Sequence, residues 1–177
     1  MKETISQEAL DVISRFQNLN IGGKKVVAPY YMNIKKERAG LRAMIGKGSP
    51  EEIELEVKVW AHAKGIDLNR LDAKQIREFM IERGIGIDCS GFVTYILNKE
   101  LQDKGFGSLW NYLQFKQNDI FSVLKRKLRP VENIGANLMT NENNTIKIKD
   151  LNEIRPGDLI RSKGKVKNSH HVAIIIE

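Results

Sequence analysis

Only one cysteine occurs in the 177 residues, at position 89. A single thiol cannot close a disulfide within the chain, so the cysteine content does not distinguish an oxidising compartment from a reducing one. Long hydrophobic runs are also missing, whereas a membrane-spanning helix needs about 20 apolar residues. The N-terminal sequence MKETISQEALDVISRF carries acidic and polar residues where a secretory signal needs an unbroken apolar stretch. We therefore expect no membrane span and a cytoplasmic location, with export by another route left open.

Metal-ligand spacing is absent too. Three histidines and one cysteine form no zinc pattern, so we expect no metal site. The net charge of +7 favours an anionic partner, such as a cell-wall polymer, a membrane surface or nucleic acid. The cationic residues are spread over several runs, no zinc-finger or RNP-type motif occurs, and aromatic residues do not interleave with the basic runs. We expect contact with an anionic polymer and no nucleic-acid binding.

What is present is an ordinary globular composition, with 41% hydrophobic and 29% charged residues. Residues 5–16 have apolar side chains at helical spacing. Ser49, Pro50 and Glu52 form a capping signature before a second helix, and Asp72 with Gln75 repeats it before a third. Residues 20–48 show no long periodic element, so we expect a loop with a short helix there. Residues 108–128 predict one or two further helices.

Strand signals come only in the last part of the chain. NENNTIKIKD at 141–150 shows a polar turn followed by alternation, RPGDLI at 155–160 a turn entering a strand, and HHVAIII at 170–176 a strand rich in β-branched residues. Asp158 fits a turn residue that binds nearby backbone amides. The order of the elements, with helices first and strands last, predicts an α+β domain in which an antiparallel sheet packs on helices.

The cysteine lies in the stretch GIGIDCSGFVTYIL, residues 84–97. An apolar stripe after Cys89 predicts that a helix begins there, with Asp88 as its cap. The positive end of a helix favours a thiolate, and its free N–H groups can hold an oxyanion. The negative charge of Asp88 disfavours a thiolate, so we expect a capping or orienting role for it. Ser90 is small and leaves the approach of a substrate to the thiol open. The alternative is a buried cysteine that only packs.

Three motifs follow one another in the order DCSGF (88–92), PGD (156–158) and a histidine before Val-Ala-Ile (171–174). Together they resemble the NlpC/P60 superfamily of papain-like cysteine peptidases. The resemblance covers about residues 84–104 and 154–177. It implies a catalytic helix on an antiparallel sheet, Cys89 as nucleophile, His171 as general base and no cofactor. The implied substrate is a peptide or peptidoglycan fragment, cleaved at an amide bond of a bacterial cell-wall peptide.

On this basis we expect an N-terminal helical extension over 1–83 and a catalytic core over 84–177, with a helical insert at about 101–130, together forming one compact unit. Strand alternation helps to choose between the two adjacent histidines. His171 shares a face with Ala173, where a small residue lets a helix approach closely. His170 points to the other face and is expected to be a rim residue, with a substrate contact as the alternative role.

The chain departs from the family pattern at two places. The family orients its histidine with a polar residue on the next strand, but the given sequence stops six residues after His171, so the orienting residue is unidentified. The family's tyrosine and Gly-Gly pair lie shortly before the cysteine, whereas here GGKKVVAPYY is much farther back. Tyr30 or Tyr31 therefore lines the substrate site or anchors a loop. Two other functions stay open: a binding module of the same fold without turnover, and a thioester-forming acyltransferase.

Overall fold

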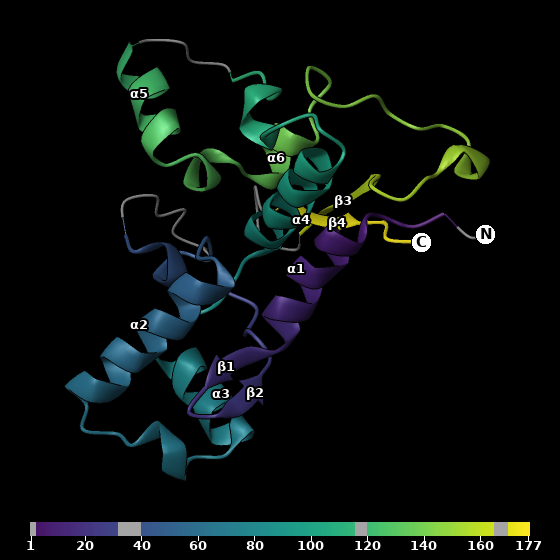
Figure 1. Ribbon diagram of the computed structural model, residues 1–177. Helices are drawn as coiled ribbons and strands as arrows, with labels where there is room; N and C mark the ends of the chain where they lie inside the picture. The colour runs from purple at the N-terminus through teal and green to yellow at the C-terminus, as the bar shows by residue number, and fades with distance from the viewer. Residues whose placement is uncertain (1–2, 32–39, 116–119, 165–169) are drawn as a thin grey trace. The chain divides into compact units, whose positions relative to one another are not determined.

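A computed structural model describes residues 3–31, 40–115, 120–164 and 170–177 (Figure 1). The described chain mixes helices with two small antiparallel sheets, which agrees with the α+β class. The helices and strands are α1 (Gln7–Gln17), β1 (Leu19–Ile21), β2 (Lys24–Val26), α2 (Pro50–Ala63), α3 (Ala73–Glu82), α4 (Cys89–Asp103), α5 (Ile120–Leu128), α6 (Ala136–Met139), β3 (Leu159–Lys163) and β4 (His170–Ile174). No helix in these ranges is long and apolar enough to cross a bilayer.

Contacts divide the chain into two compact units. The N-terminal unit is Asp11–Asp88, and the C-terminal unit combines Met1–Leu10 with Cys89–Glu177. From the sequence we expected one compact unit, with an extension that includes the first residues and ends at residue 83. The structure divides the chain between Asp88 and Cys89 and groups the first ten residues with the C-terminal unit.

The N-terminal unit contains a hairpin where the sequence analysis expected a loop. Strands β1 and β2 pair antiparallel around Gly22 and Gly23, which have φ values of 56° and 72°. Two central residues with positive φ are what a two-residue hairpin turn needs, because its twist then matches that of the strands. The hairpin buries Leu19, Ile21 and Val26, and it packs on α2 and α3. The expectation of a loop at these residues was wrong.

Both predicted capping boxes are confirmed. The Ser49 hydroxyl accepts the N–H of Glu52, whose carboxylate accepts the N–H of Ser49, so α2 begins at Pro50 as expected. Asp72 and Gln75 make the same exchange before α3. Each box satisfies two N–H groups that a helix start leaves without intrahelical partners.

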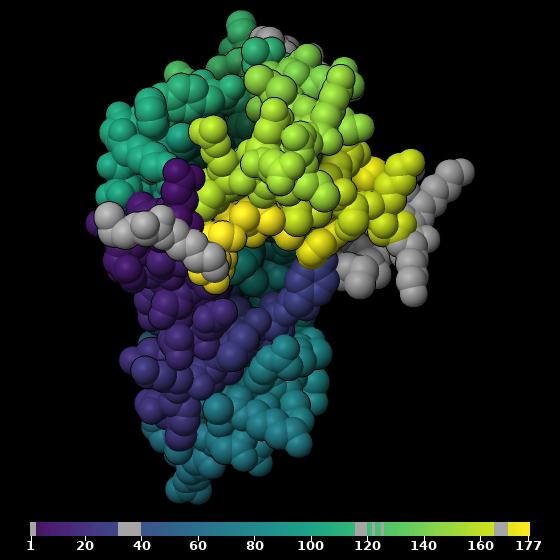
Figure 2. Space-filling view, turned by 90° about the vertical axis from the view of Figure 1, so that its right-hand side faces the viewer, coloured from purple at the N-terminus to yellow at the C-terminus, as the bar shows by residue number. Residues whose placement is uncertain are grey.

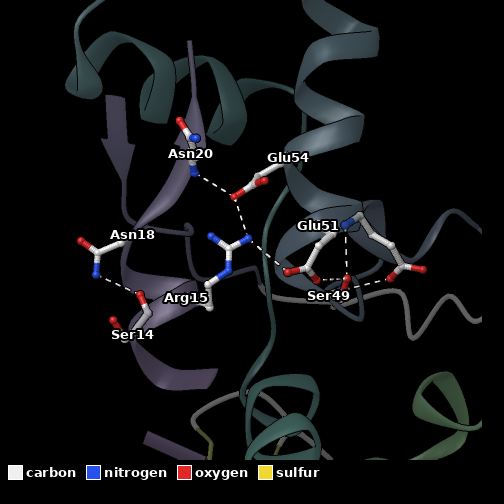
Figure 3. Close-up of polar contacts among 8 residues, drawn as sticks. Ser14, Arg15, Asn18, Asn20, Ser49, Glu51 and Glu54 are labelled. Carbon is white, nitrogen blue, oxygen red and sulfur yellow. Dashed lines mark hydrogen bonds and ion pairs between the residues drawn. The ribbon is translucent and has the colours of Figure 1, made fainter. Parts of the chain in front are cut away.

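Arg15 of α1 joins the hairpin to α2 (Figure 3). Its guanidinium donates to Glu51 at 3.1 Å and to Glu54 at 3.2 Å, and the Glu54 carboxylate also accepts the N–H of Asn20 at 2.7 Å. The hydrogen bond to Glu51 is the main reason why the pKa of Arg15 lies above its ordinary value. Because Arg15 and Glu51 are exposed, the network contributes orientation more than stability.

In the C-terminal unit, α4 packs against β4, and β3 pairs antiparallel with β4. The turn before β3 is as predicted: Gly157 has φ 97°, and the Asp158 carboxylate accepts the N–H of Arg155 at 2.6 Å. The core of this unit is an apolar cluster with contributions from α4, β4, α6 and the 3-10 turns. Its buried members are Val93, Leu109, Ile134, Ala136, Met139 and Val172.

Two sequence expectations in this unit need correction or refinement. Residues 141–150 form a turn and an irregular segment instead of a strand, and Ile146 is almost fully exposed because no partner strand covers it. The helical insert expected at about 101–130 contains the end of α4, a 3-10 turn at Leu109–Asn111 and α5. Some segments lie outside the described residues. They are residues 116–119 of that insert and, among the cationic runs of the sequence, the run at 35–38 and part of the run at 161–167.

The first residues of the chain pack against its last ones in the C-terminal unit (Figures 1 and 2). The N–H of Ile5 and the hydroxyl of Thr4 both donate to the carbonyl of Ile176, at 3.2 and 2.8 Å. The N–H of Ser6 donates to the Glu100 carboxylate at 2.7 Å, and Lys104 binds the same carboxylate at 2.7 Å. We call residues 4–6 the N-terminal strap.

Glu100 makes the stability of the strap dependent on pH. Burial raises the pKa of Glu100, but the hydrogen bonds from Lys104 and Ser6 outweigh burial, so the pKa lies below its ordinary value of 4.5. The folded state therefore prefers the ionised carboxylate. The stabilisation is present above the unfolded pKa and is lost as the pH falls through the lower folded pKa.

We predict that Glu100→Gln lowers the free energy of unfolding by about 1 to 3 kcal/mol at neutral pH, because a charged acceptor of two hydrogen bonds is lost. The variant should also lose less stability than the native chain between neutral and acidic pH. Urea unfolding across this pH range measures both effects. Glu142→Gln, at an exposed loop position of the same unit, is the matched control and should change little. An acid dependence unchanged in Glu100→Gln would contradict the prediction.

Candidate functional site

Cys89 is the first residue of α4 and is half-buried. The apolar stripe predicted after it is present, since Val93 and Ile96 are buried. The Cys89 side chain packs against the apolar cluster that contains Val93 and Val172, the latter on β4. The thiol therefore lies at a helix start, beside the core that joins α4 to the histidine-bearing strand.

Backbone hydrogen bonds hold the segment that leads to Cys89. Every residue from 86 to 88 donates its N–H to another part of the N-terminal unit, and residue 87 also accepts one bond. These bonds run from Gly86 to Ala43, from Ile87 to Pro29, from Asp88 to Gly46 and from Tyr31 to Ile87, at 2.9 to 3.1 Å. Four bonds over three consecutive residues leave this segment little freedom.

Gly46 allows the close approach in this segment. Its φ is +73°, a conformation that L side chains rarely adopt, and a Cβ at this position would lie 2.9 Å from both Asp88 Cβ and Tyr31 Cδ1. The backbone of residue 46 thus lies against Asp88 and the Tyr31 ring, where any side chain would collide.

Asp88 forms a buried ion pair with Lys47. Lys47 Nζ lies 3.0 Å from Asp88 Oδ1, and the two side chains are only 6% and 14% exposed. Pairing offsets the cost of removing the two charges from water, because an unpaired buried charge is strongly destabilising. From the sequence we expected Asp88 to have a capping or orienting role. The helix does begin at the next residue, but Lys47, which the sequence analysis did not single out, binds the carboxylate.

The Ser90 side chain is buried. Its carbonyl accepts the hydroxyl of Thr94, one turn further along α4, at 2.6 Å. The second residue of the helix therefore contributes its backbone N–H to the helix start, while its side chain belongs to the interior.

The burial of β4 differs from the sequence expectation. Val172 is the buried residue of the strand, at 1% exposure, whereas Ala173 is half-buried and His171 is exposed. Valine removes more apolar surface from water than alanine does, so its burial in the cluster stabilises the strand more. The packed face is therefore that of Val172, which His170 shares by strand alternation, and the expectation that the face of Ala173 is the closely packed one was wrong.

His170 contacts a cation on the neighbouring strand. Arg161 Nη2 lies 3.3 Å from His170 Nδ1 and 2.8 Å from Asn137 Oδ1 of α6. A guanidinium can only donate hydrogen bonds, so His170 Nδ1 must accept in this contact and the neutral ring then carries its proton on Nε2.

The remaining predicted residues lie in the N-terminal unit. Tyr30 is exposed and forms a β-bridge with Ile87, and Tyr31 is half-buried with its ring against Gly46. The structure brings Tyr31 next to Asp88 and shows both tyrosines anchored to the segment before Cys89. His62 is exposed in the last turn of α2. Among the described residues, no group of three or more histidine, cysteine, aspartate and glutamate side chains could hold a metal ion.

Comparisons of the chain with family models, with curated proteins and with solved structures found no match.

We predict that Lys47→Met lowers the free energy of unfolding by about 3 to 5 kcal/mol, because it leaves the Asp88 carboxylate buried without its cation. Asp88→Asn in the Lys47→Met background should restore part of the loss. The control is Lys74→Met, whose partner Glu78 lies 3.9 Å away on an exposed surface, so the loss should be about 0.5 kcal/mol or less. Urea unfolding of the four proteins tests this. Equal losses in the two single variants would exclude a special role for the buried pair.

Proposed function

We propose that the chain is a cysteine hydrolase of the NlpC/P60 type, with a papain-like core, that cleaves amide bonds through Cys89 and His171. The observation that carries the proposal is the position of Cys89 at the first residue of α4, a helix that packs on the strand beginning with His170 and His171. This combination of helix and antiparallel hairpin is the one implied by the sequence resemblance.

The electrostatics at the start of α4 support a nucleophilic role. The first N–H groups of a helix and its macrodipole favour an anion, so they stabilise a thiolate and later the oxyanion of a tetrahedral intermediate. Asp88, joined to Cys89 by a peptide bond, carries a charge that opposes a thiolate. Lys47 at 3.0 Å offsets that charge. The ion pair thus makes an acidic residue next to the nucleophile tolerable.

Of the two histidines, His171 is proposed as the general base. Arg161 Nη2 lies against His170 Nδ1, the ring nitrogen that would have to accept the proton, so His170 is the weaker candidate for the base. His171 is chosen because it is the histidine that directly precedes the valine in the motif, although strand alternation places its side chain on the face of β4 opposite Val172.

Ser162 is proposed as the group that orients His171. The strand register places Ser162 directly opposite His171, and side chains at opposed positions have Cβ atoms about 4.5 to 5.5 Å apart. A serine hydroxyl at that distance can accept the imidazole N–H and so select one tautomer. This supplies a polar orienting group from β3 within the described chain.

In the proposed reaction, His171 takes the proton of Cys89, and the thiolate attacks the amide carbonyl. The carbon–nitrogen bond breaks as His171 returns the proton to the leaving amine, which leaves a thioester on Cys89. Water then adds to the thioester with His171 as base and releases the acid. The proposed substrate is a peptide of the bacterial cell wall, as the resemblance implies. The net charge of +7 would attract the chain to an anionic cell-wall polymer.

The histidine pair provides a matched test of the catalytic pairing. We expect His171→Ala to slow the alkylation of Cys89 by iodoacetamide at neutral pH by about tenfold, because the thiolate loses its imidazolium partner. His170→Ala should leave the alkylation profile against pH nearly unchanged, and Ser162→Ala should give an intermediate loss. The alkylation rate as a function of pH measures all three.

The opposite order, with His170→Ala slowing alkylation and His171→Ala not, would reject His171 as the base. Profiles that coincide in all variants would reject the catalytic pairing altogether.

Turnover is tested with purified cell-wall peptides. We expect the native chain to release new amino groups and Cys89→Ser to release at least about a hundredfold fewer, since a serine hydroxyl is almost never ionised at neutral pH. The His170→Ala variant should raise KM more than it lowers kcat. A reactive Cys89 that depends on His171, without any cleavage, would point to a binding module or an acyltransferase and would overturn the hydrolase assignment.

A further inference from the structure

Helix α5 turns its apolar side outward. Ile120, Phe121, Leu124 and Leu128 are 84%, 83%, 54% and 68% exposed. At about 100° of rotation per residue these four side chains fall within an arc of about 100° on one side of the helix. We call them the exposed face of α5. A short surface helix normally buries such a face, so its exposure needs an explanation.

The opposite side of α5 holds the helix to the C-terminal unit. Val123 and Arg126 are half-buried, and the Arg126 guanidinium lies 4.5 Å from the centre of the Phe115 ring. A groove of about 540 Å³ runs along this side, lined by Trp110, Leu113, Phe115 and these two residues among others. The Arg126–Phe115 contact therefore lies on the side of α5 opposite the exposed face, beside the groove.

Charge identifies the kind of surface that would cover the exposed face. Residues 120–129, IFSVLKRKLR, contain four cationic residues and no acidic one. Lys127 is exposed, whereas Arg129 pairs with Glu132 at 2.7 Å. An apolar face combined with cationic residues is the pattern of helices that lie in the plane of a membrane surface, with apolar side chains among the acyl chains and cations at anionic headgroups.

We infer that α5 is a membrane-surface anchor that docks the chain on anionic lipid bilayers through the exposed face. An acidic protein or a nucleic acid fits the cations equally well. Only a lipid surface also accepts a phenylalanine, an isoleucine and two leucines side by side without a shaped pocket. The inference is independent of the proposed hydrolase activity, because it uses no residue of the candidate site.

Vesicle sedimentation tests the anchor. The native chain should pellet with phosphatidylglycerol-containing vesicles at low salt, and much less with pure phosphatidylcholine vesicles or at high salt. Phe121→Ser combined with Leu124→Ser should weaken the binding by about tenfold or more, because two large apolar side chains leave the bilayer. Lys127→Gln should weaken it by about fivefold, the expected contribution of one cation near an anionic surface.

The matched control replaces two exposed apolar residues elsewhere in the same unit. Ile146 and Leu151 are 95% and 82% exposed, so Ile146→Ser with Leu151→Ser removes as much surface hydrophobicity and should leave binding unchanged. Circular dichroism checks that all variants keep their helix content, which is expected because the replaced side chains are largely exposed.

Three results would overturn the inference. The first is failure of the native chain to pellet with anionic vesicles. The second is an equal loss of binding in the control variant. The third is binding to a random-sequence DNA duplex that matches vesicle binding in strength and is unaffected by Phe121→Ser with Leu124→Ser, which would assign the surface to polyanions instead.

Discussion

The buried ion pair between Lys47 and Asp88 is the constraint on which the candidate site depends. Asp88 ends one compact unit and Cys89 begins the other, so the residue bonded to the thiol-bearing one is fixed by a charge pair and by its N–H bond to Gly46. Burying two charges costs desolvation, and close pairing offsets that cost. The pair therefore fixes the end of the segment from 86 to 88 and, in the proposed mechanism, offsets the negative charge of the residue bonded to Cys89.

Much of the fold could be predicted from local signals. The capping boxes at Ser49 and Asp72 mark helix starts within one residue, because each box is a short-range exchange of hydrogen bonds between residues three apart. The Gly22-Gly23 turn was an equally local signal that sequence reasoning passed over. Residues 141–150 show the opposite case. Alternation there has the right period for a strand, but no partner strand covers it among the described residues, and pairing is not visible in a local pattern.

The candidate site was predictable only in part. Cys89 at a helix start and a histidine at a strand start both follow from residue patterns, and both are present. Lys47 could not be found in this way, because it is one of many lysines and lies 41 residues from its partner. Arg161 is similar: only the strand register brings it beside His170. Which face of β4 is packed was also undecidable from alternation alone, since both Val172 and Ala173 are apolar.

The N-terminal strap has a consequence for the order in which the protein folds during synthesis. Ile5 binds Ile176, a partner 171 residues later in the chain, whereas Asp11–Asp88 forms its unit from one continuous segment. On the ribosome the continuous unit can fold as soon as it emerges, because all the residues that form its internal contacts have then been translated. The strap must wait for the last strand, with its amides solvated until then. The packing around the thiol-bearing helix is thus completed only after residue 176 has been translated.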